Sequence, residues 1–364
     1  MSNTFPWKDF KNKAKKENHS DSYITATEKY TNNLKSKNLP VLFSTKHLSA
    51  ALEISYKELV ELIRDRETHY SQFKIRKKRG GVRNILSPDT TLKYIHRCIN
   101  NSILSKFPIS EYCFSFKEGH SIKQNAKVHV NQYHIFKLDL YKFFESITEK
   151  RVYGIFHKVA GYHKNISVDL AKLCTYFPSK YYWEHIIEED PPQGFNVYNR
   201  TILPQGAPTS PALSNLVVYK LDRRLSGLAH SLHLNYSRYA DDLTFSGNEE
   251  SNFPISTIEK IIREEGFFIN SSKTYLRKRG QRQLVNGLTI TNGVHVPKTQ
   301  KNEIWKHLYF ARKYGPINHL EFLGLEDKSS FKEWLLGHIS YVYSIEPEVG
   351  KKMLDSFNKI IWPL

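Results

Sequence analysis

The stretch that decides the fold is YSRYADDLTFS, at residues 236–246. Apolar and polar residues alternate on both sides of the Asp241-Asp242 pair, which is typical of two half-buried strands that meet at a tight turn. Hairpin turns favour Asn-Gly or Asp-Gly, whereas two adjacent carboxylates repel each other. Such a pair can bind divalent cations, which take oxygen ligands. The alternative is a solvated acidic turn.

Charge is the strongest global feature of this chain. Its 54 Lys and Arg residues against 36 Asp and Glu residues give a net charge of +18. Such an excess favours a polyanionic partner, and 22 Tyr with 21 Phe residues offer surfaces on which unpaired bases can stack. We therefore predict binding to nucleic acid. A basic protein without such a partner, or one at an anionic membrane surface, is the alternative.

Length and composition limit the class of protein. The 364 residues, 40% of them apolar, are enough for several packed lobes. No run of roughly 18 apolar residues predicts a membrane span, and residues 1–10 lack the apolar region of a secretory signal. The three cysteines show no Cys-x-x-Cys spacing, which argues against a zinc site and a disulfide framework. We expect a cytoplasmic protein without a membrane association.

A second hairpin is predicted at residues 73–86, where alternating residues flank Gly80-Gly81. Its tip is densely cationic, and a cationic hairpin can close over phosphates. A charged surface hairpin is the alternative, although the charge density here exceeds what solubility requires.

A third carboxylate ends an apolar strand predicted over residues 133–140. Asp139 at the mouth of this strand is costly unless it is paired, hydrogen-bonded or metal-bound. Three aspartates on neighbouring strands, with cationic hairpins nearby, suit metal-assisted phosphoryl transfer. No Ser-His-Asp spacing or Walker loop offers a comparable alternative.

The other segments are mainly predicted to be helical. Residues 203–211 read LPQGAPTSP, in which Gly206 permits close backbone approach to a ligand, and a long helix is expected over 212–229. A basic run at 277–282 precedes a strand predicted over 283–290, and a hairpin is expected at Asn292-Gly293.

In this order, the motifs resemble those of reverse transcriptases, and most of all the retron reverse transcriptases of bacteria. The resemblance runs from about Phe73 to the C-terminus and covers, in turn, a fingers hairpin, motifs A to D and a primer-grip strand, at residues 73–83, 139–144, 203–211, 239–242, 266–273 and 285–288. Two features resemble retrons specifically. Asn125-Ala126-x-x-His129 matches region X, and Val285-Asn286-Gly287 stands where retrons carry Val-Thr-Gly in region Y, with Asn in place of Thr.

The resemblance implies an α+β fold of the right-hand polymerase class, with fingers, a palm built on an antiparallel sheet, and a helical thumb. We expect a basic N-terminal extension over residues 1–43 and fingers with a helical lead-in over 44–132. The palm, with an interleaved fingers segment, would span 133–296, and the helical thumb 297–364.

The resemblance also implies roles for individual residues. Asp139, Asp241 and Asp242 would bind two Mg²⁺ ions, with Mn²⁺ as a possible substitute, and the Leu140 carbonyl would assist. Lys273 would protonate pyrophosphate. The incoming nucleotide would be held by Arg83, one of Lys77 or Lys78, the steric-gate residue Phe144, Gln205 and Gly206. Nucleic acid would be contacted by Asn125, His129, Arg277, Lys278, Arg282, Val285, Asn286, Gly287, Lys298 and Lys301.

Other interpretations of some of these residues stay open. Asn125 could cap a turn, His129 could be a satisfied buried imidazole, and the basic run at 277–282 could be a solvated face. Phe143 is interpreted as a core residue rather than a ligand.

The implied reaction is RNA-templated DNA synthesis from dNTPs. The resemblance to retrons further implies a cognate structured noncoding RNA, priming from an internal 2′-hydroxyl, a branched RNA–DNA product (msDNA), and antiphage defence with a separate effector protein, with a higher-order complex possible. One alternative is a group II intron-like or other defence-associated reverse transcriptase, although no obvious maturase extension follows the thumb. The other is an inactive RNA-binding scaffold, which the intact aspartates argue against.

Overall fold

The fold is built around a four-stranded antiparallel sheet, seen in a computed structural model that describes residues 6–76, 82–186, 191–196, 200–325 and 330–363. Its strand order is β4-β5-β3-β6. The strands are Asn235–Tyr239 (β4), Asp242–Gly247 (β5), His134–Asp139 (β3) and Tyr275–Lys278 (β6). The register pairs Asp139 with Asp242 across β3 and β5, so the sheet itself brings two of the predicted carboxylates together.

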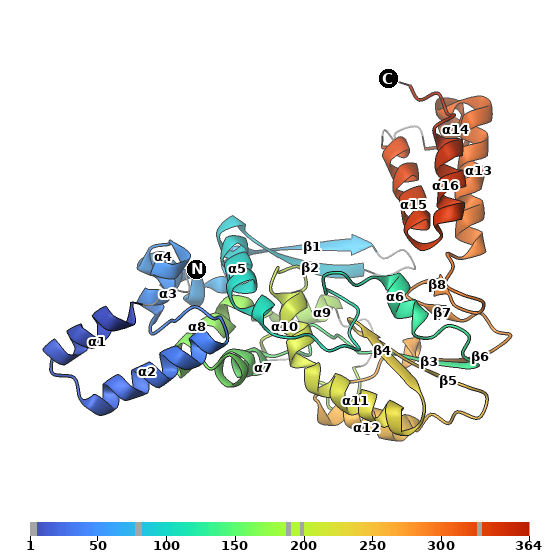
Figure 1. Cartoon of the computed structure of the whole chain (residues 1–364). Coiled ribbons are helices and arrows are strands. Elements are labelled where there is room, and N and C mark those ends of the chain that lie inside the picture. Colours follow the sequence, from blue (N-terminus) through green and yellow to red (C-terminus); the bar gives the residue numbers. More distant parts are fainter. Residues whose placement is uncertain (1–5, 77–81, 187–190, 197–199, 326–329, 364) are drawn as a thin grey trace.

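Strand β3 is buried on both faces. Phe136 and Leu138 point into the main core, which they share with α11 (Tyr219–Ser231) and α12 (Ile255–Glu264). Those two helices lie beneath the sheet in Figure 1. Ile135, on the opposite face, belongs to a second core. Because side chains alternate along a strand, Lys137 and Asp139 share the face of Ile135.

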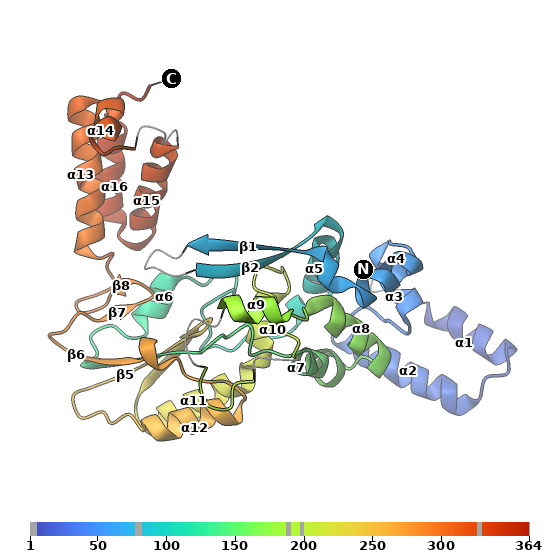
Figure 2. The same cartoon turned by 180° about the vertical axis from the view of Figure 1, so that it is seen from behind.

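The predicted basic hairpin is present as β1 (Tyr70–Arg76) and β2 (Val82–Pro88), paired antiparallel. In Figures 1 and 2 it extends from α5 (Thr90–Ser102) toward the side on which the C-terminal helices stand. Further helices precede and follow the hairpin along the chain. They are α3 (Thr45–Leu52), α4 (Tyr56–Arg64), α6 (Ile122–Lys127), α7 (Glu149–Gly154), the π-helix Ile155–Ala160, α8 (Lys164–Cys174) and α9 (Lys180–Ile186).

The N-terminal segment is helical, with α1 at Trp7–Lys16 and α2 at Asp21–Ser36. The end of α2 and the residues that follow it pack onto the rest of the protein, because Leu34, Leu39 and Leu42 are fully buried in the main core. Lys37 also donates from its Nζ to the carbonyl oxygen of Val159, at 2.9 Å. The later part of the predicted extension is thus packed against the main core and the π-helix Ile155–Ala160.

Two element predictions are corrected by the structure. The helix expected over 212–229 is divided at Val218 into α10 (Ser210–Val217) and α11, without a proline or glycine to mark the break. The strand expected over 283–290 is a hairpin of β7 (Leu284–Val285) and β8 (Leu288–Thr289). Asn286 and Gly287 form its turn with φ values of 49° and 81°, because Asn-Gly is the favoured sequence for such turns.

The hairpin predicted at Asn292-Gly293 is also present. Its ends pair through Thr289 and His295, whose backbone groups exchange two hydrogen bonds of 2.8 and 2.9 Å. Two tight turns in succession therefore lead from the sheet to the C-terminal helices.

The C-terminal segment, predicted to be mainly helical, forms a lobe whose described residues contain α13 (Lys298–Tyr314), α14 (Pro316–Phe322), α15 (Phe331–Ile345) and α16 (Pro347–Phe357). It rises from one end of the body in Figure 1, opposite α1 and α2. Its core is continuous with Val285, Leu288 and Ile135, so the lobe is packed onto the sheet region. Glu346 adds a polar link, since it accepts hydrogen bonds from Lys301 Nζ and the Val296 backbone N–H, both at 2.9 Å.

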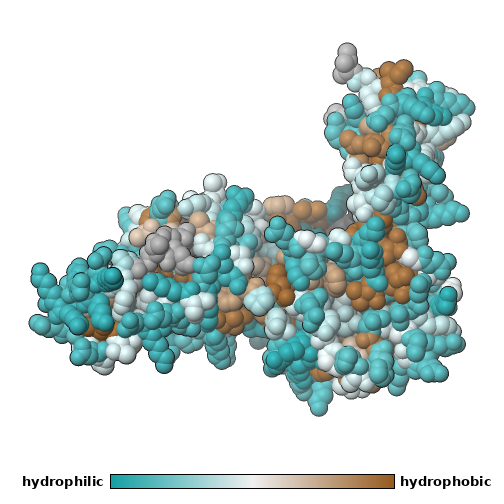
Figure 3. Space-filling model, in the orientation of Figure 1, coloured by the Kyte–Doolittle hydropathy of each residue, from teal (hydrophilic) through white to brown (hydrophobic). Residues whose placement is uncertain are grey.

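Most of the surface in Figure 3 is hydrophilic, with hydrophobic residues gathered on the C-terminal lobe and at its base. None of the helices in the described ranges is both long enough and apolar enough to cross a membrane.

The contact between α15 and α16 yields a stability prediction. A Cβ at Gly350 would lie 2.3 Å from the Cα of Tyr343, so we expect Gly350→Ala to lower the free energy of unfolding of the lobe by about 1–3 kcal/mol. The matched control is Gly337→Ala in α15, where a Cβ meets nothing within 4 Å. That variant should raise the free energy of unfolding by about 0.5–1 kcal/mol. Urea unfolding followed by tryptophan fluorescence measures both, and equal midpoints would contradict the close crossing.

Candidate active site

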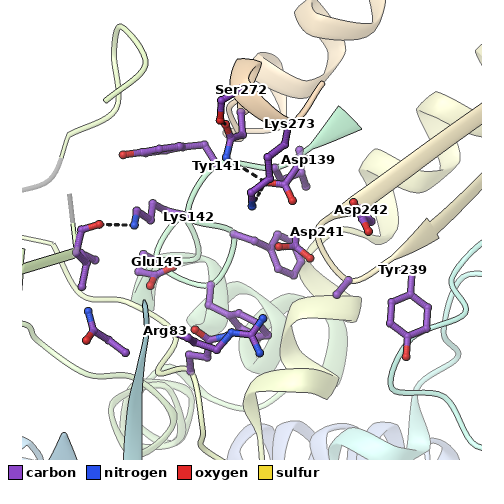
Figure 4. Close-up of a pocket in the computed structure, with 18 of the residues that line it drawn as sticks. Arg83, Asp139, Tyr141, Lys142, Glu145, Tyr239, Asp241, Asp242, Ser272 and Lys273 are labelled. Carbon is purple, nitrogen blue, oxygen red and sulfur yellow. Dashed lines mark hydrogen bonds and ion pairs between the residues drawn. The ribbon is translucent and has the colours of Figure 1, made fainter. Parts of the chain in front are cut away.

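A cavity of about 520 Å³ lies at the end of β3 and β5. All three predicted aspartates line it, together with residues of the basic hairpin, the 203–211 loop and the segment after α12. Figure 4 shows Asp139, Asp241 and Asp242 on one side of the cavity, where Lys273 contacts Asp139. Arg83 lies on the opposite side. The sequence prediction that these distant motifs meet is therefore matched by the geometry.

Asp139 is held by the segment after α12. Its Oδ1 accepts hydrogen bonds from Lys273 Nζ at 2.9 Å and from Asn270 Nδ2 at 3.2 Å. Asn270 also donates its backbone N–H to the Asp139 carbonyl, at 2.8 Å. Burial, opposed by Lys273 and reinforced by the charge of Asp242, raises the pKa of Asp139. Burial alone would lower the pKa of Lys273, but its bond to Asp139 raises it.

Asp241 lies in the turn between β4 and β5. The two turn residues are Ala240 and Asp241, and Ala240 has a φ of 55°, a region usually left to glycine. The Asp241 carbonyl accepts a hydrogen bond of 2.9 Å from the Leu140 backbone N–H, which ties the turn to the end of β3. Burial, followed by repulsion from Asp139 and Asp242, raises the pKa of Asp241 to about 7.

Asp242 differs from the expectation that both carboxylates crowd the tip of the hairpin. It is the first residue of β5 and pairs in register with Asp139. Its Oδ2 lies 3.3 Å from Nζ of Lys137, a lysine that is only 8% exposed. Ala240 is the turn residue with the positive φ, Asp241 follows it in the turn, and Asp242 already belongs to strand β5. The two adjacent carboxylates therefore start from different backbone conformations.

The oxygen ligands that divalent cations prefer are present in this cavity. Three carboxylates line one cavity, and their mutual repulsion contributes to the raised pKa of Asp139 and Asp241. Within the described residues, however, no three His, Cys, Asp or Glu side chains are gathered closely enough to hold a metal ion. Lys273 and Asn270 both donate to Oδ1 of Asp139, and a cation would be coordinated through the second carboxylate oxygen, Oδ2.

The predicted nucleotide-binding residues lie partly around the same cavity. Arg83, Phe144 and Gln205 line it. Gly206 has a φ of 126°, and a Cβ there would be 2.8 Å from the Leu86 carbonyl oxygen, so this glycine permits a close approach to β2. Lys77 and Lys78 lie outside the described residues.

The residues predicted to contact nucleic acid differ in how exposed they are. Those with exposed side chains or backbone are Arg277, Lys278, Arg282, Gly287 and Lys298. Asn125, His129 and Val285 are at most 1% exposed, so their side chains lie in the interior of the protein. Asn286 is half-buried in its turn. The Nζ of Lys301 lies 2.9 Å from both carboxylate oxygens of Glu346, so this lysine links parts of the lobe.

His129 is the satisfied buried imidazole that the sequence left open. Its Nδ1 and Nε2 each lie 2.7 Å from a serine hydroxyl, Ser246 on β5 and Ser237 on β4. Burial, and to a smaller extent the charge of Lys137, lowers the pKa of His129 to about 3. The imidazole therefore joins the segment after α6 to two strands of the sheet.

Sequence reasoning missed several residues that shape the site. Lys137 stands two positions before Asp139, so the two-residue period of a strand could have placed it beside the carboxylates. Asn270 lies within a motif that had been recognised. Lys142, which lines the cavity and donates from its Nζ to the Ile186 carbonyl, carried no comparable signal. The buried pair of Arg238 and Asp222 carried none either.

Comparisons with known proteins identify the family of this chain. Residues 75–301 match the family described as reverse transcriptase (RNA-dependent DNA polymerase). The retron Mx65 reverse transcriptase of Myxococcus xanthus is 33% identical over 326 residues, which cover 86% of this chain and 71% of that protein. The retron Ec86 reverse transcriptase of Escherichia coli is 32% identical over 339 residues, covering 90% and 97%. A foamy viral protease-reverse transcriptase solved with an RNA/DNA hybrid aligns with a TM-score of 0.38 and 16% identity, covering 81% of this chain and 34% of that one.

The family match spans more than half of the chain, and about a third of the residues are identical to retron enzymes along most of its length. The chain therefore belongs to the retron reverse transcriptases, and it is an RNA-directed DNA polymerase. The predicted fold class, an α+β right-hand polymerase, and the predicted enzyme class are both confirmed.

The burial of His129 generates a prediction about pH. Its pKa is about 3 in the folded protein against an ordinary value of 6.5, so the unfolded state binds the proton first as pH falls. We expect the free energy of unfolding to decrease as pH is lowered from about 6.5 toward about 3. His129→Gln should show a shallower decrease in urea unfolding across this window, whereas the exposed His230→Gln should keep the wild-type slope. Identical slopes for His129→Gln and wild type would contradict the buried neutral imidazole.

Proposed function

We propose that this reverse transcriptase copies part of a cognate structured noncoding RNA into DNA and leaves the two joined as branched msDNA. The observation that carries the polymerase site is the cavity in which Asp139, Asp241 and Asp242 meet. The retron relatives support the RNA template and the branched product.

In the proposed reaction, a primer hydroxyl attacks the α-phosphorus of a dNTP, and the bond to the bridging oxygen of pyrophosphate breaks. Asp139 and Asp241 would hold two Mg²⁺ ions, or Mn²⁺, with Asp242 as the third acidic group and the Leu140 carbonyl as a further ligand. When bound, such ions stabilise the attacking and leaving oxygens. Lys273 would donate a proton to pyrophosphate, for which its Nζ has to leave Asp139 Oδ1, now 2.9 Å away.

The nucleotide would be held across the cavity from the carboxylates. Arg83, with Lys77 or Lys78, would neutralise the triphosphate charge. Phe144 would exclude a ribose 2′-hydroxyl by its bulk, and Gln205 with Gly206 would form the floor. The position of Arg83, Phe144 and Gln205 on the cavity wall supports these roles.

The RNA and its DNA product would contact the exposed basic surface beyond the palm sheet. Arg277, Lys278 and Arg282 stand on or after β6, and Lys298 begins α13. These side chains are exposed, and phosphate contacts are made by such cations. Asn286 and Gly287, in the turn at the base of the lobe, would take part in RNA recognition.

The biological role that follows is antiphage defence in the cytoplasm. We infer priming from a 2′-hydroxyl of the noncoding RNA and a separate effector protein, in a possible higher-order complex. Membership in the retron family supports this role.

The catalytic assignment predicts the effect of removing carboxylates. The double variant Asp241→Asn, Asp242→Asn should lose about three orders of magnitude in dNTP incorporation on an RNA template, because several kcal/mol of charge stabilisation disappear. Asp355→Asn, on the exposed face of α16, is the control and should keep wild-type incorporation. RNA binding, measured by filter retention, should be unchanged in both variants. Full incorporation by the double variant would overturn the assignment.

The branched product is tested by sequencing nucleic acid that copurifies with the protein. We expect DNA whose 5′ end is joined to an RNA 2′-hydroxyl, so that RNase digestion leaves a short ribonucleotide remnant on the DNA. The double aspartate variant should carry RNA without DNA. Linear DNA without a ribonucleotide remnant would refute 2′-hydroxyl priming while leaving the polymerase assignment intact.

A further inference from the structure

The turn that presents Asp241 is strained and is held from below. Ala240 has a φ of 55°, and a non-glycine residue in this region costs roughly 1–2 kcal/mol. Such strain persists only where the surroundings over-determine the conformation. Neighbouring groups must therefore fix the Ala240 backbone.

Two hydrogen bonds hold both polar groups of Ala240. Its N–H donates to the hydroxyl of Ser115 at 2.7 Å, and its carbonyl accepts from Nη1 of Arg238 at 3.2 Å. Ser115 lies on a segment that runs along β4, where the Arg238 backbone N–H donates to the Tyr112 carbonyl at 2.8 Å. Both partners are completely buried. The turn is therefore attached to two immobile side chains.

Arg238 is immobilised by Asp222 on α11. Its Nε and Nη2 donate to the two carboxylate oxygens of Asp222, each at 2.8 Å, and its Nη1 also reaches Asn215 Oδ1 at 3.1 Å. Tyr236 adds a further hydrogen bond of 2.9 Å from its hydroxyl to Asp222. The guanidinium and the carboxylate are both 0% exposed, so a fully satisfied polar network lies beneath the turn.

Stability alone does not account for this network. A buried ion pair gains little over apolar residues of similar volume, because desolvation of both charges offsets their attraction. What an apolar pair cannot do is donate a hydrogen bond to the Ala240 carbonyl. The arginine thus supplies directional contact with the backbone next to Asp241.

We propose that Arg238 is a positioning residue of the polymerase, fixed by Asp222 and acting through the Ala240 carbonyl to set the position of Asp241. The inference rests on the proposed catalytic role of Asp241. Arg238 is completely buried and is not among the residues that line the cavity. Loss of its contact lets the turn relax and moves the Asp241 carboxylate away from its productive place, and displacements of about 1 Å at a reacting centre cost roughly 100-fold in rate.

The test compares two changes at the network with one change elsewhere. Arg238→Lys keeps the charge but loses the paired hydrogen bonds, and Arg238→Met with Asp222→Leu and Tyr236→Phe replaces the network by apolar groups. Steady-state kinetics on an RNA template should show kcat lowered roughly 10- to 100-fold in both. The Mg²⁺ concentration for half-maximal activity should rise, while the KM for dNTP stays near wild type. Thermal unfolding verifies that each variant is folded.

The matched control is Arg66→Lys, at a second buried arginine. Nη2 of Arg66 lies 2.8 Å from Glu149, away from the cavity. This variant should lose thermal stability without any change in the Mg²⁺ dependence. An equal shift in Arg66→Lys, or wild-type kcat and Mg²⁺ dependence in the folded Arg238 variants, would overturn the inference. Asp241→Asn separates the two hypotheses: if it stays active the proposed site fails, and if it is inactive while Arg238 variants are normal only the positioning role fails.

Discussion

Three carboxylates brought to one end of a sheet repel one another, and the surrounding structure is arranged to offset that repulsion. Each aspartate has a different environment. Asp139 is bonded to Lys273 at 2.9 Å, and Asp242 faces the buried ammonium of Lys137 at 3.3 Å. Asp241 is instead fixed through its backbone. The result is an electrostatically uneven site in which burial raises the pKa of Asp241 to about 7, helped by its acidic neighbours. Divalent cations would be attracted most strongly where the compensation is weakest.

The sequence carried enough information to predict this centre. Alternation on both sides of Asp241-Asp242 predicted the hairpin, and an apolar strand that ends in Asp139 predicted a third carboxylate. That the strands lie side by side did not follow from periodicity, because pairing partners more than 100 residues apart leave no local pattern. Family resemblance provided that step. The helical C-terminal segment was likewise predicted as the thumb that the family resemblance implies.

The parts that could not be predicted depend on tertiary contacts. His129 was open to two interpretations, since its partners Ser237 and Ser246 lie 108 and 117 residues away. Arg238 sits in an alternating strand, where a charged residue normally indicates a solvent-facing position, and its burial depends on the pairing with Asp222 of α11. Asn286-Gly287 is different. It is a strong local turn signal, and the longer strand pattern around it concealed the hairpin.

Strand β3 belongs to two cores at once. Phe136 and Leu138 pack into the main core, whereas Ile135 packs into the core that runs up through the four C-terminal helices. Packed interiors deform little, so the lower part of the thumb and the strand that carries Asp139 behave as one mechanical unit. Four residues of extended chain, about 13 Å, separate Ile135 from Asp139. Shared packing therefore fixes the distance between the base of the C-terminal lobe and the Asp139 carboxylate. A movement of the lobe relative to the sheet would have to bend the lobe above this base.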